Sequence, residues 1–118
     1  MSTSSKQLPI ITFNSLYNVL KEEERNPILN SLPEHFYEGV EEFMKSKEEE
    51  LKTNSTDVKL QHKIKTATKI YSKLQKLRAK KIAQIGIDGI EYDEDALLAI
   101  EVEYLKNIKK AFNQTYTK

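Results

Sequence analysis

The spacing of apolar residues constrains this chain more than any other feature, because it follows a helical period from residue 12 to residue 113. Apolar side chains recur three or four positions apart, and no stretch alternates apolar and polar residues as a strand does. We predict an all-α fold with four main helices in a bundle, one of them long and basic, and an antiparallel helical hairpin in the C-terminal half. The length of 118 residues suits one domain. The predicted organisation is a flexible N-terminal lead-in (1–11), one helical domain (12–113) and a C-terminal tail (114–118).

Capping residues and prolines set the expected ends of the first two helices. The first helix is expected to begin at Thr12 or Asn14 and to stop near Arg25, because Pro27 biases the residue before it away from helical angles. The second is expected to start in a capping box at Ser31–Glu34.

The third predicted helix is the longest. It is expected to start at Ser55 or Asp57 and to run to about Ile85, with Gly86 as its C-terminal stop. At ~1.5 Å per residue it would be about 43 Å long. A compact chain of this size has a diameter of only ~35 Å, so one end is expected to protrude or to meet a partner. The last helix is expected to begin after Asp93 and to end near residue 113.

Composition excludes several functional classes. The chain has no Cys, which excludes a disulfide scaffold, an iron–sulfur site and thiol catalysis. Its two histidines, His35 and His62, do not have the spacing of a metal-binding pair, and no Gly-rich phosphate loop occurs. The consecutive glutamates of Glu22–Glu24 and Glu48–Glu50 are interpreted as a solvated face rather than as an acid/base pair. We therefore expect no enzymatic activity, no metal and no cofactor.

Two further absences concern cellular location. No run of residues approaches the ~18 apolar positions that a transmembrane helix needs. The opening MSTSSKQLPII lacks the charged and apolar regions of a signal peptide. We expect an intracellular protein with no membrane contact.

Charge is distributed unevenly along the chain. Residues 21–50 hold ten acids and four bases, whereas residues 58–87 hold nine bases and no acid. One interpretation is a solvated lysine face that balances the acidic helix before it. The other is an electrostatic surface for a nucleic-acid backbone or an acidic protein. The candidate nucleic-acid contacts are Lys63, Lys69, Lys73, Lys76 and Lys80.

Two charged residues fall on apolar helix faces. Arg78 lies within the apolar arc of the long helix, and Glu101 lies within that of the last helix. In an antiparallel hairpin the two would lie at similar distances from the turn. We predict that they form a buried or half-buried ion pair that fixes register. The alternative is that Arg78 extends its guanidinium to solvent.

The last helix is predicted to carry more apolar surface than one core uses. Its apolar positions span about 200°, whereas packing on a single core needs a stripe a little over ~100° wide. The excess predicts a second contact surface and a homo- or hetero-oligomer, although a wedge between two neighbouring helices would also use it. The expected interface residues are Leu97, Ile100, Tyr104, Ile108 and Ala111, with Tyr37 as a lesser candidate.

The order and spacing of four segments resemble a GINS complex subunit. An acidic helix is followed by a short break, a Leu-Pro motif that leads a second acidic helix, a long basic helix, and a turn before the final helix. The resemblance covers residues 12–113 and is greatest to the archaeal type with the helical domain first. The matching segments are Leu16–Leu20 with Glu22–Arg25, Leu32–Tyr37, Val40–Phe43 and Leu77–Ile82 before the turn Gly86–Tyr92.

The resemblance implies a non-catalytic scaffold of DNA replication. GINS subunits assemble through their helical domains, and the complex joins the MCM helicase to a Cdc45/RecJ-like factor. Such a protein would be cytoplasmic and nucleoid-associated, or nuclear in a eukaryote. The small β domain that usually follows the helices has no room in residues 114–118, so a truncated or reduced relative is expected. The alternative function is a free-standing basic helical protein that binds a nucleic-acid backbone, and weak DNA contact is compatible with either.

Overall fold

The computed structural model describes residues 7–117, and helices are the only regular secondary structure among them. The predicted all-α class with four main helices is confirmed. The elements are α1 (Phe13–Arg25), α2 (Phe36–Thr53), α3 (Val58–Asp88), the short 3₁₀ turn η1 (Glu94–Ala96) and α4 (Ala99–Tyr116).

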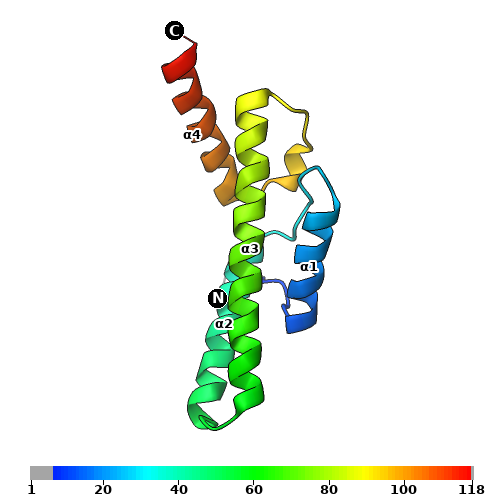
Figure 1. The fold of residues 1–118 in the computed structure, drawn as a ribbon, viewed down its shortest axis with the longest axis vertical. Helices are drawn as coiled ribbons and strands as arrows, with labels where there is room; N and C mark the ends of the chain where they lie inside the picture. The colour runs from blue at the N-terminus through cyan, green and yellow to red at the C-terminus, as the bar shows by residue number, and fades with distance from the viewer. Residues whose placement is uncertain (1–6, 118) are drawn as a thin grey trace, which may run out of the picture.

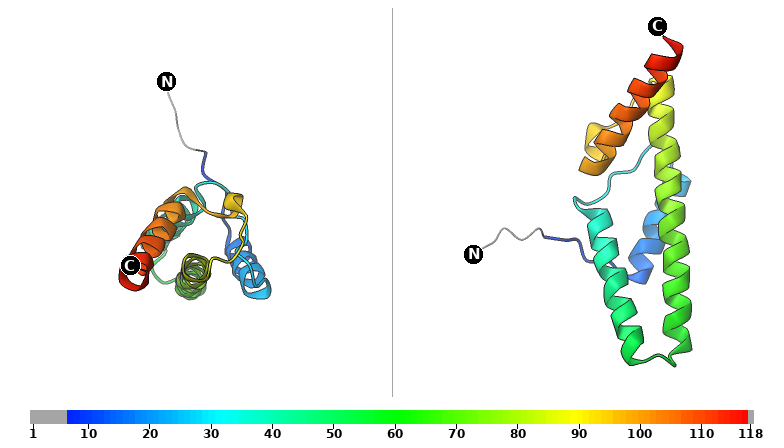
Figure 2. Two further views of the ribbon diagram at one scale, coloured as in Figure 1. Left: turned by 90° about the horizontal axis from the view of Figure 1, so that it is seen from above. Right: turned by 90° about the vertical axis from the view of Figure 1, so that its left-hand side faces the viewer.

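The long helix α3 is the axis on which the other helices pack (Figure 1). α2 and α3 form an antiparallel hairpin, while α1 runs beside α3 in the same direction as α3. Figure 2 shows α1 and α4 on opposite flanks of α3. The radius of gyration is 17.1 Å, and the principal extents are 58 × 38 × 24 Å. A compact chain of this length has a radius of gyration near 13–14 Å, so the molecule is elongated.

The prediction of an antiparallel hairpin between the last two helices is wrong, because α4 runs in the same direction as α3 (Figure 1). Arg78 donates hydrogen bonds to Glu101, and Gly86, further along α3, lies against Ile108, further along α4. Residue numbers therefore increase in the same direction along both helices. The connection 89–98 therefore returns along α3 before α4 begins. It does so because apolar residues within the connection pack on α3: its Ala96 joins Ile82 in a buried cluster.

Caps hold the starts of α1 and α3 where the sequence predicts. The Thr12 hydroxyl accepts from the backbone N–H of Ser15 at 2.9 Å. The Asp57 carboxylate accepts from the backbone N–H of Leu60 at 3.0 Å. α1 ends at Arg25, and the next residue is extended.

The predicted capping box at Ser31–Glu34 is wrong, because α2 begins only at Phe36. His35 precedes it in the left-handed region, at φ 61° and ψ 28°. Tertiary contacts hold the preceding stretch out of a helix: Leu32 packs against the core, and the carbonyl oxygen of Asn30 accepts from a buried arginine at 2.6 Å.

Gly86 does not stop α3, which continues to Asp88. The left-handed cap is Gly89, with φ 66°, and its N–H donates to the carbonyl oxygen of Ile85 at 3.0 Å. Gly86 instead makes room for α4. A Cβ at this position would lie 2.7 Å from Cγ2 of Ile108, so the missing side chain lets α4 approach closely.

The predicted bounds of the last helix also shift. Asp93 caps η1 rather than a long helix, and α4 begins at Ala99 and extends to Tyr116. The predicted tail 114–118 is therefore mostly helical within the described residues. Of the predicted lead-in 1–11, residues 1–6 lie outside the described residues. Pro9 lies against Gly39, and Ile11 packs against the core.

The apolar core is divided into two clusters along α3. The first core cluster lies between α1, α2 and the first half of α3, and the second lies between the second half of α3, η1 and α4. The first consists of Leu16, Leu20, Phe36, Val40, Ala67, Leu74 and Leu98. The second consists of Leu29, Ile82, Ile85, Ala96 and Leu105.

Candidate functional site

A buried arginine lies on α3 between the two core clusters. Arg78 is 0% exposed, and its Nε and Nη2 donate to the two carboxylate oxygens of Glu101 at 2.9 and 2.7 Å. Its remaining N–H groups donate to the carboxylate of Glu23 at 2.8 Å and to the carbonyl oxygens of Asn30 and Ala96 at 2.6 and 2.8 Å. All five donors of the guanidinium are therefore used. The predicted ion pair between Arg78 and Glu101 is present, and it is bidentate.

The same network reaches every helix. Glu23, on α1, is 0% exposed and also accepts from Lys81 Nζ at 2.6 Å. Glu101, on α4, also accepts from the hydroxyl of Tyr37 on α2 at 2.7 Å. Two buried carboxylates thus face two cations from α3, which balances their charge. We call Arg78, Glu23, Glu101, Lys81 and Tyr37 the arginine network.

Lys81 also holds the end of α1. Its Nζ donates to the backbone carbonyl oxygens of Glu23, Asn26 and Ile28 at 2.7, 2.8 and 2.8 Å. A cation at this place satisfies carbonyl groups that have no partner within the helix and complements the negative end of the helix dipole.

Sequence reasoning missed Glu23 and Lys81. Glu23 was expected on a solvated face with its two neighbours, but its side chain is buried. The signal was present: Glu23 lies three positions after the buried Leu20 and seven after the buried Leu16, so it falls on the apolar face of α1.

The network shifts the pKa values of Tyr37 and Glu101. Burial raises the pKa of the Tyr37 hydroxyl, and the neighbouring Glu101 carboxylate raises it further. Burial also favours a higher pKa for Glu101, but the hydrogen bonds and charge of Arg78 outweigh it and hold that pKa below its usual value. Nearby on α2 and α3, burial and Glu41 raise the pKa of Tyr71 to about 12. The arrangement keeps Arg78 and Glu101 charged and Tyr37 neutral, all three paired with one another, which suits a joint between helices rather than proton exchange with a ligand.

Glu101 makes folding stability sensitive to acid. Its folded pKa lies below the ordinary 4.5, so its ion pair stabilises the fold above that pH and is lost as the pH falls through the folded pKa. We expect Glu101→Gln to be less stable than the wild type at neutral pH and to lose less stability on acidification. Urea unfolding at pH values from about 7 to 3 measures this difference. Parallel stability profiles for the two proteins would contradict it.

The structure divides the six predicted interface residues into two groups. Tyr37, Leu97 and Ile100 line one groove of about 640 Å³, where the starts of α2 and α4 meet. We call it the α2–α4 groove; its apolar lining is Leu32, Tyr37, Leu97, Leu98, Ala99 and Ile100. The right-hand view of Figure 2 shows the two helix starts close together.

The other predicted residues follow α4 away from the groove. Tyr104 and Ala111 are exposed, whereas Ile108 is half-buried against Gly86. Ile100 is 71% exposed, and only Glu101 and Leu105 of α4 are buried. α4 packs lengthwise on α3, so its outer side is not wedged against a second helix. We call the exposed residues Ile100, Tyr104 and Ala111, together with the half-buried Leu97 just before α4, the α4 strip.

The predicted lysine contacts are exposed but do not share one face. Lys69, Lys73, Lys76 and Lys80 recur three or four positions apart and lie on one side of α3, together with the exposed Lys65. We call these five residues the α3 lysine face. Lys63 points elsewhere, with its Nζ 5.8 Å from the centre of the Phe13 ring. Lys73 pairs with Glu24 of α1 at 3.0 Å.

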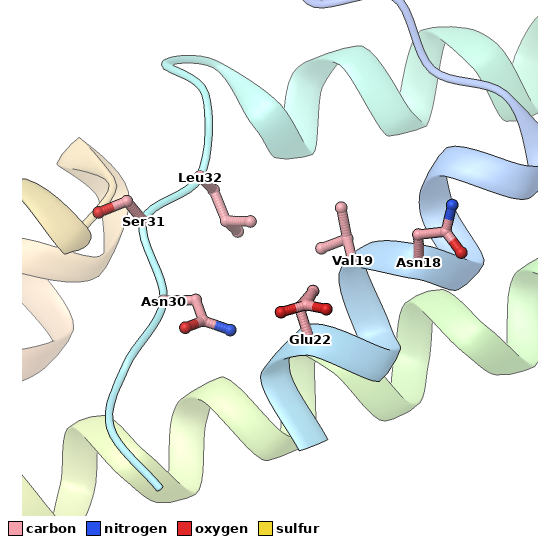
Figure 3. A pocket seen from close by; sticks show the side chains of 6 residues that line it. All are labelled: Asn18, Val19, Glu22, Asn30, Ser31 and Leu32. Carbon is pink, nitrogen blue, oxygen red and sulfur yellow. The ribbon is translucent and has the colours of Figure 1, made fainter. Parts of the chain in front are cut away.

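Another hollow, of about 340 Å³, lies between α1 and the connection to α2. Figure 3 shows the side chains that line it, which are Val19 and Leu32 together with four polar residues. Within residues 7–117, no group of three or more His, Asp or Glu side chains is placed to hold a metal ion. In the same part of the chain, no helix combines the length and apolarity needed to cross a membrane.

Comparison of the chain with protein-family models, with curated proteins and with solved structures yields no match.

Proposed function

We propose that this protein is a non-catalytic assembly subunit of a GINS-like DNA replication complex. In this role it binds other GINS subunits. Through these subunits or together with them, it binds the replicative MCM helicase and a Cdc45/RecJ-like factor. The observation that carries the proposal is the uncovered α4 strip. The protein would act in the cytoplasm at the nucleoid, or in a eukaryotic nucleus.

The geometry of α4 supports an assembly role. Ile100 and Tyr104 are 71% and 39% exposed, and Tyr116 near the end of α4 is 73% exposed. The last turns of α4 extend past the end of α3 (Figure 1). Contiguous apolar surface that the chain does not cover is typical of a protein–protein interface. The arginine network fixes the position of α4, so the strip is presented on a rigid element.

Co-purification tests the proposal. The full chain, tagged and expressed in its native cells, is expected to recover GINS-type subunits together with the MCM helicase. Ile100→Ser/Tyr104→Ser should lose them, because both side chains lie in the strip. Val58→Ser is the matched control, since Val58 is 72% exposed and lies at the far end of the molecule. Recovery of no replication protein, or equal recovery by both variants, would contradict the proposal.

The α3 lysine face favours a second candidate function, which is binding to a nucleic-acid backbone. If its five lysines each contact a phosphate of duplex DNA, log K should fall against log salt with a slope of about −4.5. Replacing Lys69, Lys76 and Lys80 by Gln should reduce that slope by about 2 to 3. Replacing Lys106, Lys109 and Lys110 of α4 by Gln removes the same charge elsewhere and should leave it unchanged. Absence of binding at low salt would exclude this function.

A further inference from the structure

The α2–α4 groove has an acidic rim around an apolar floor. Glu34, Glu38 and Glu41 line it from the α2 side, and Glu94 and Asp95 line it from the η1 side. Among the described residues that line the groove, none is Lys or Arg. The floor is formed by half-buried and exposed apolar side chains, including Tyr37, Leu97 and Ile100.

Several of these carboxylates are open to an incoming cation. The Glu34 side chain is 90% exposed, and one of its oxygens lies 3.9 Å from Nε2 of the His35 ring. Glu41 accepts a hydrogen bond from the neutral Tyr71 hydroxyl at 3.4 Å. Within residues 7–117, the side chains of Glu94 and Asp95 form no ion pair with Lys or Arg.

We propose that the α2–α4 groove binds a Lys- or Arg-containing segment of a partner protein, with a large apolar side chain as its anchor. The anchor lies between Tyr37, Leu97 and Ile100, and the cations of the segment face the carboxylates on both rims. The inference rests on the proposed function, because the groove and the α4 strip share Leu97 and Ile100, and it names the chemistry of the partner at that site.

Charge and volume together select this occupant. An acidic rim attracts a basic segment and repels nucleic-acid phosphate, so the groove is not a nucleic-acid site. A volume of about 640 Å³ is large enough for several side chains. The apolar floor supplies affinity, whereas the carboxylates supply orientation and discrimination against acidic segments.

Peptide binding tests the inference. The probe is a fluorescein-labelled dodecapeptide in which Lys and Arg flank two Leu residues, titrated with the full chain and followed by fluorescence anisotropy. We expect it to bind, and we expect a peptide with Glu in place of Lys and Arg not to bind. A peptide with Ser in place of Leu should bind about tenfold more weakly. Equal binding of the basic and acidic peptides would overturn the inference.

Paired variants locate the binding. Glu34→Gln/Glu94→Gln neutralises one carboxylate on each rim and should weaken binding of the basic peptide about tenfold. Glu48→Gln/Glu49→Gln makes the same charge change at exposed positions near the other end of α2 and should change it less than about twofold. Circular dichroism checks that each variant keeps its helix content. Equal affinities of the two variants would overturn the inference.

Light scattering on the same samples separates this inference from the proposed function. If the chain self-associates and only the groove variant prevents it, a second copy occupies the groove and the inference fails. If assembly through the α4 strip persists while the basic peptide does not bind, the inference fails and the proposed function stands. Peptide binding without any assembly supports the inference and counts against the proposed function.

Discussion

Replacing Arg78 by Met is expected to cost about 3–5 kcal/mol of unfolding free energy, because it removes the cation and leaves buried carboxylates without their partner. Glu23 and Glu101 are 0% and 6% exposed, so water cannot replace the lost hydrogen bonds without opening the fold. A small domain has a total stability of about 5–15 kcal/mol, so a loss of this size is a large fraction of the total. Urea unfolding followed by circular dichroism measures the change.

Two controls show that the loss belongs to the network. Arg25→Met removes an arginine whose side chain is 69% exposed and which pairs with Glu22, and it should cost less than about 1 kcal/mol. Adding Glu23→Gln and Glu101→Gln to Arg78→Met removes the uncompensated charges and should restore part of the stability. A cost of Arg78→Met as small as that of Arg25→Met would show that the network does not hold the helices together.

Replacing Gly86 by Val is expected to displace α4 from α3 and to cost about 1–3 kcal/mol, because the packed interface has no room for a larger side chain. A Cβ at this position would lie 2.7 Å from Ile108 Cγ2 and 3.3 Å from Leu105 Cδ1. Val is a slightly better helix former than Gly, so the loss would arise from the contact with α4 and not from α3 itself. The measurement is urea unfolding, together with chemical shifts of α4 amides.

Compensation on the facing helix tests the cause. Ile108→Ala removes the side chain that the new Val would meet, so Gly86→Val/Ile108→Ala should be more stable than the sum of the two single changes predicts. Gln75→Val is the control, because Gln75 is exposed on the same helix, and it should change stability by less than about 0.5 kcal/mol. A destabilisation that Ile108→Ala leaves unchanged would contradict the close approach of the two helices.

The helices themselves could be predicted because their signals are local. The Thr12 and Asp57 caps, and the stop before Pro27, act within one turn of the residue concerned. The burial of Arg78 and Glu101 followed from their places within apolar arcs, because a charge on a buried face requires a partner. Arg78 and Glu101 carry opposite charges on such faces, and they do pair.

The direction of α4 could not be predicted from the same pattern. An apolar arc specifies which face of a helix is buried, but not whether its neighbour runs parallel or antiparallel. The pair Arg78–Glu101 is compatible with both directions, since one contact does not define an orientation. The deciding feature is the connection 89–98, whose Ala96 and Leu98 are buried and carry the chain back along α3.

The α2–α4 groove could not be predicted for a different reason. A capping box at Ser31–Glu34 is a local preference, and the contacts of Leu32 and Asn30 with the rest of the chain override it. The α2–α4 groove depends on that displaced start of α2, because it opens between Glu34 and Glu94. Tyr37, Leu97 and Ile100 could be identified singly, whereas their common groove needed the fold.

The most direct test of the assembly role is the molar mass of the full chain in solution, measured by size-exclusion chromatography with light scattering over a wide concentration range. We expect a mass that rises from the 13.7 kDa monomer to a dimer or tetramer as concentration increases. Ile100→Ser/Tyr104→Ser should stay monomeric, because it removes apolar side chains from the α4 strip. A wild-type chain that remains at 13.7 kDa at every concentration would contradict the assembly role.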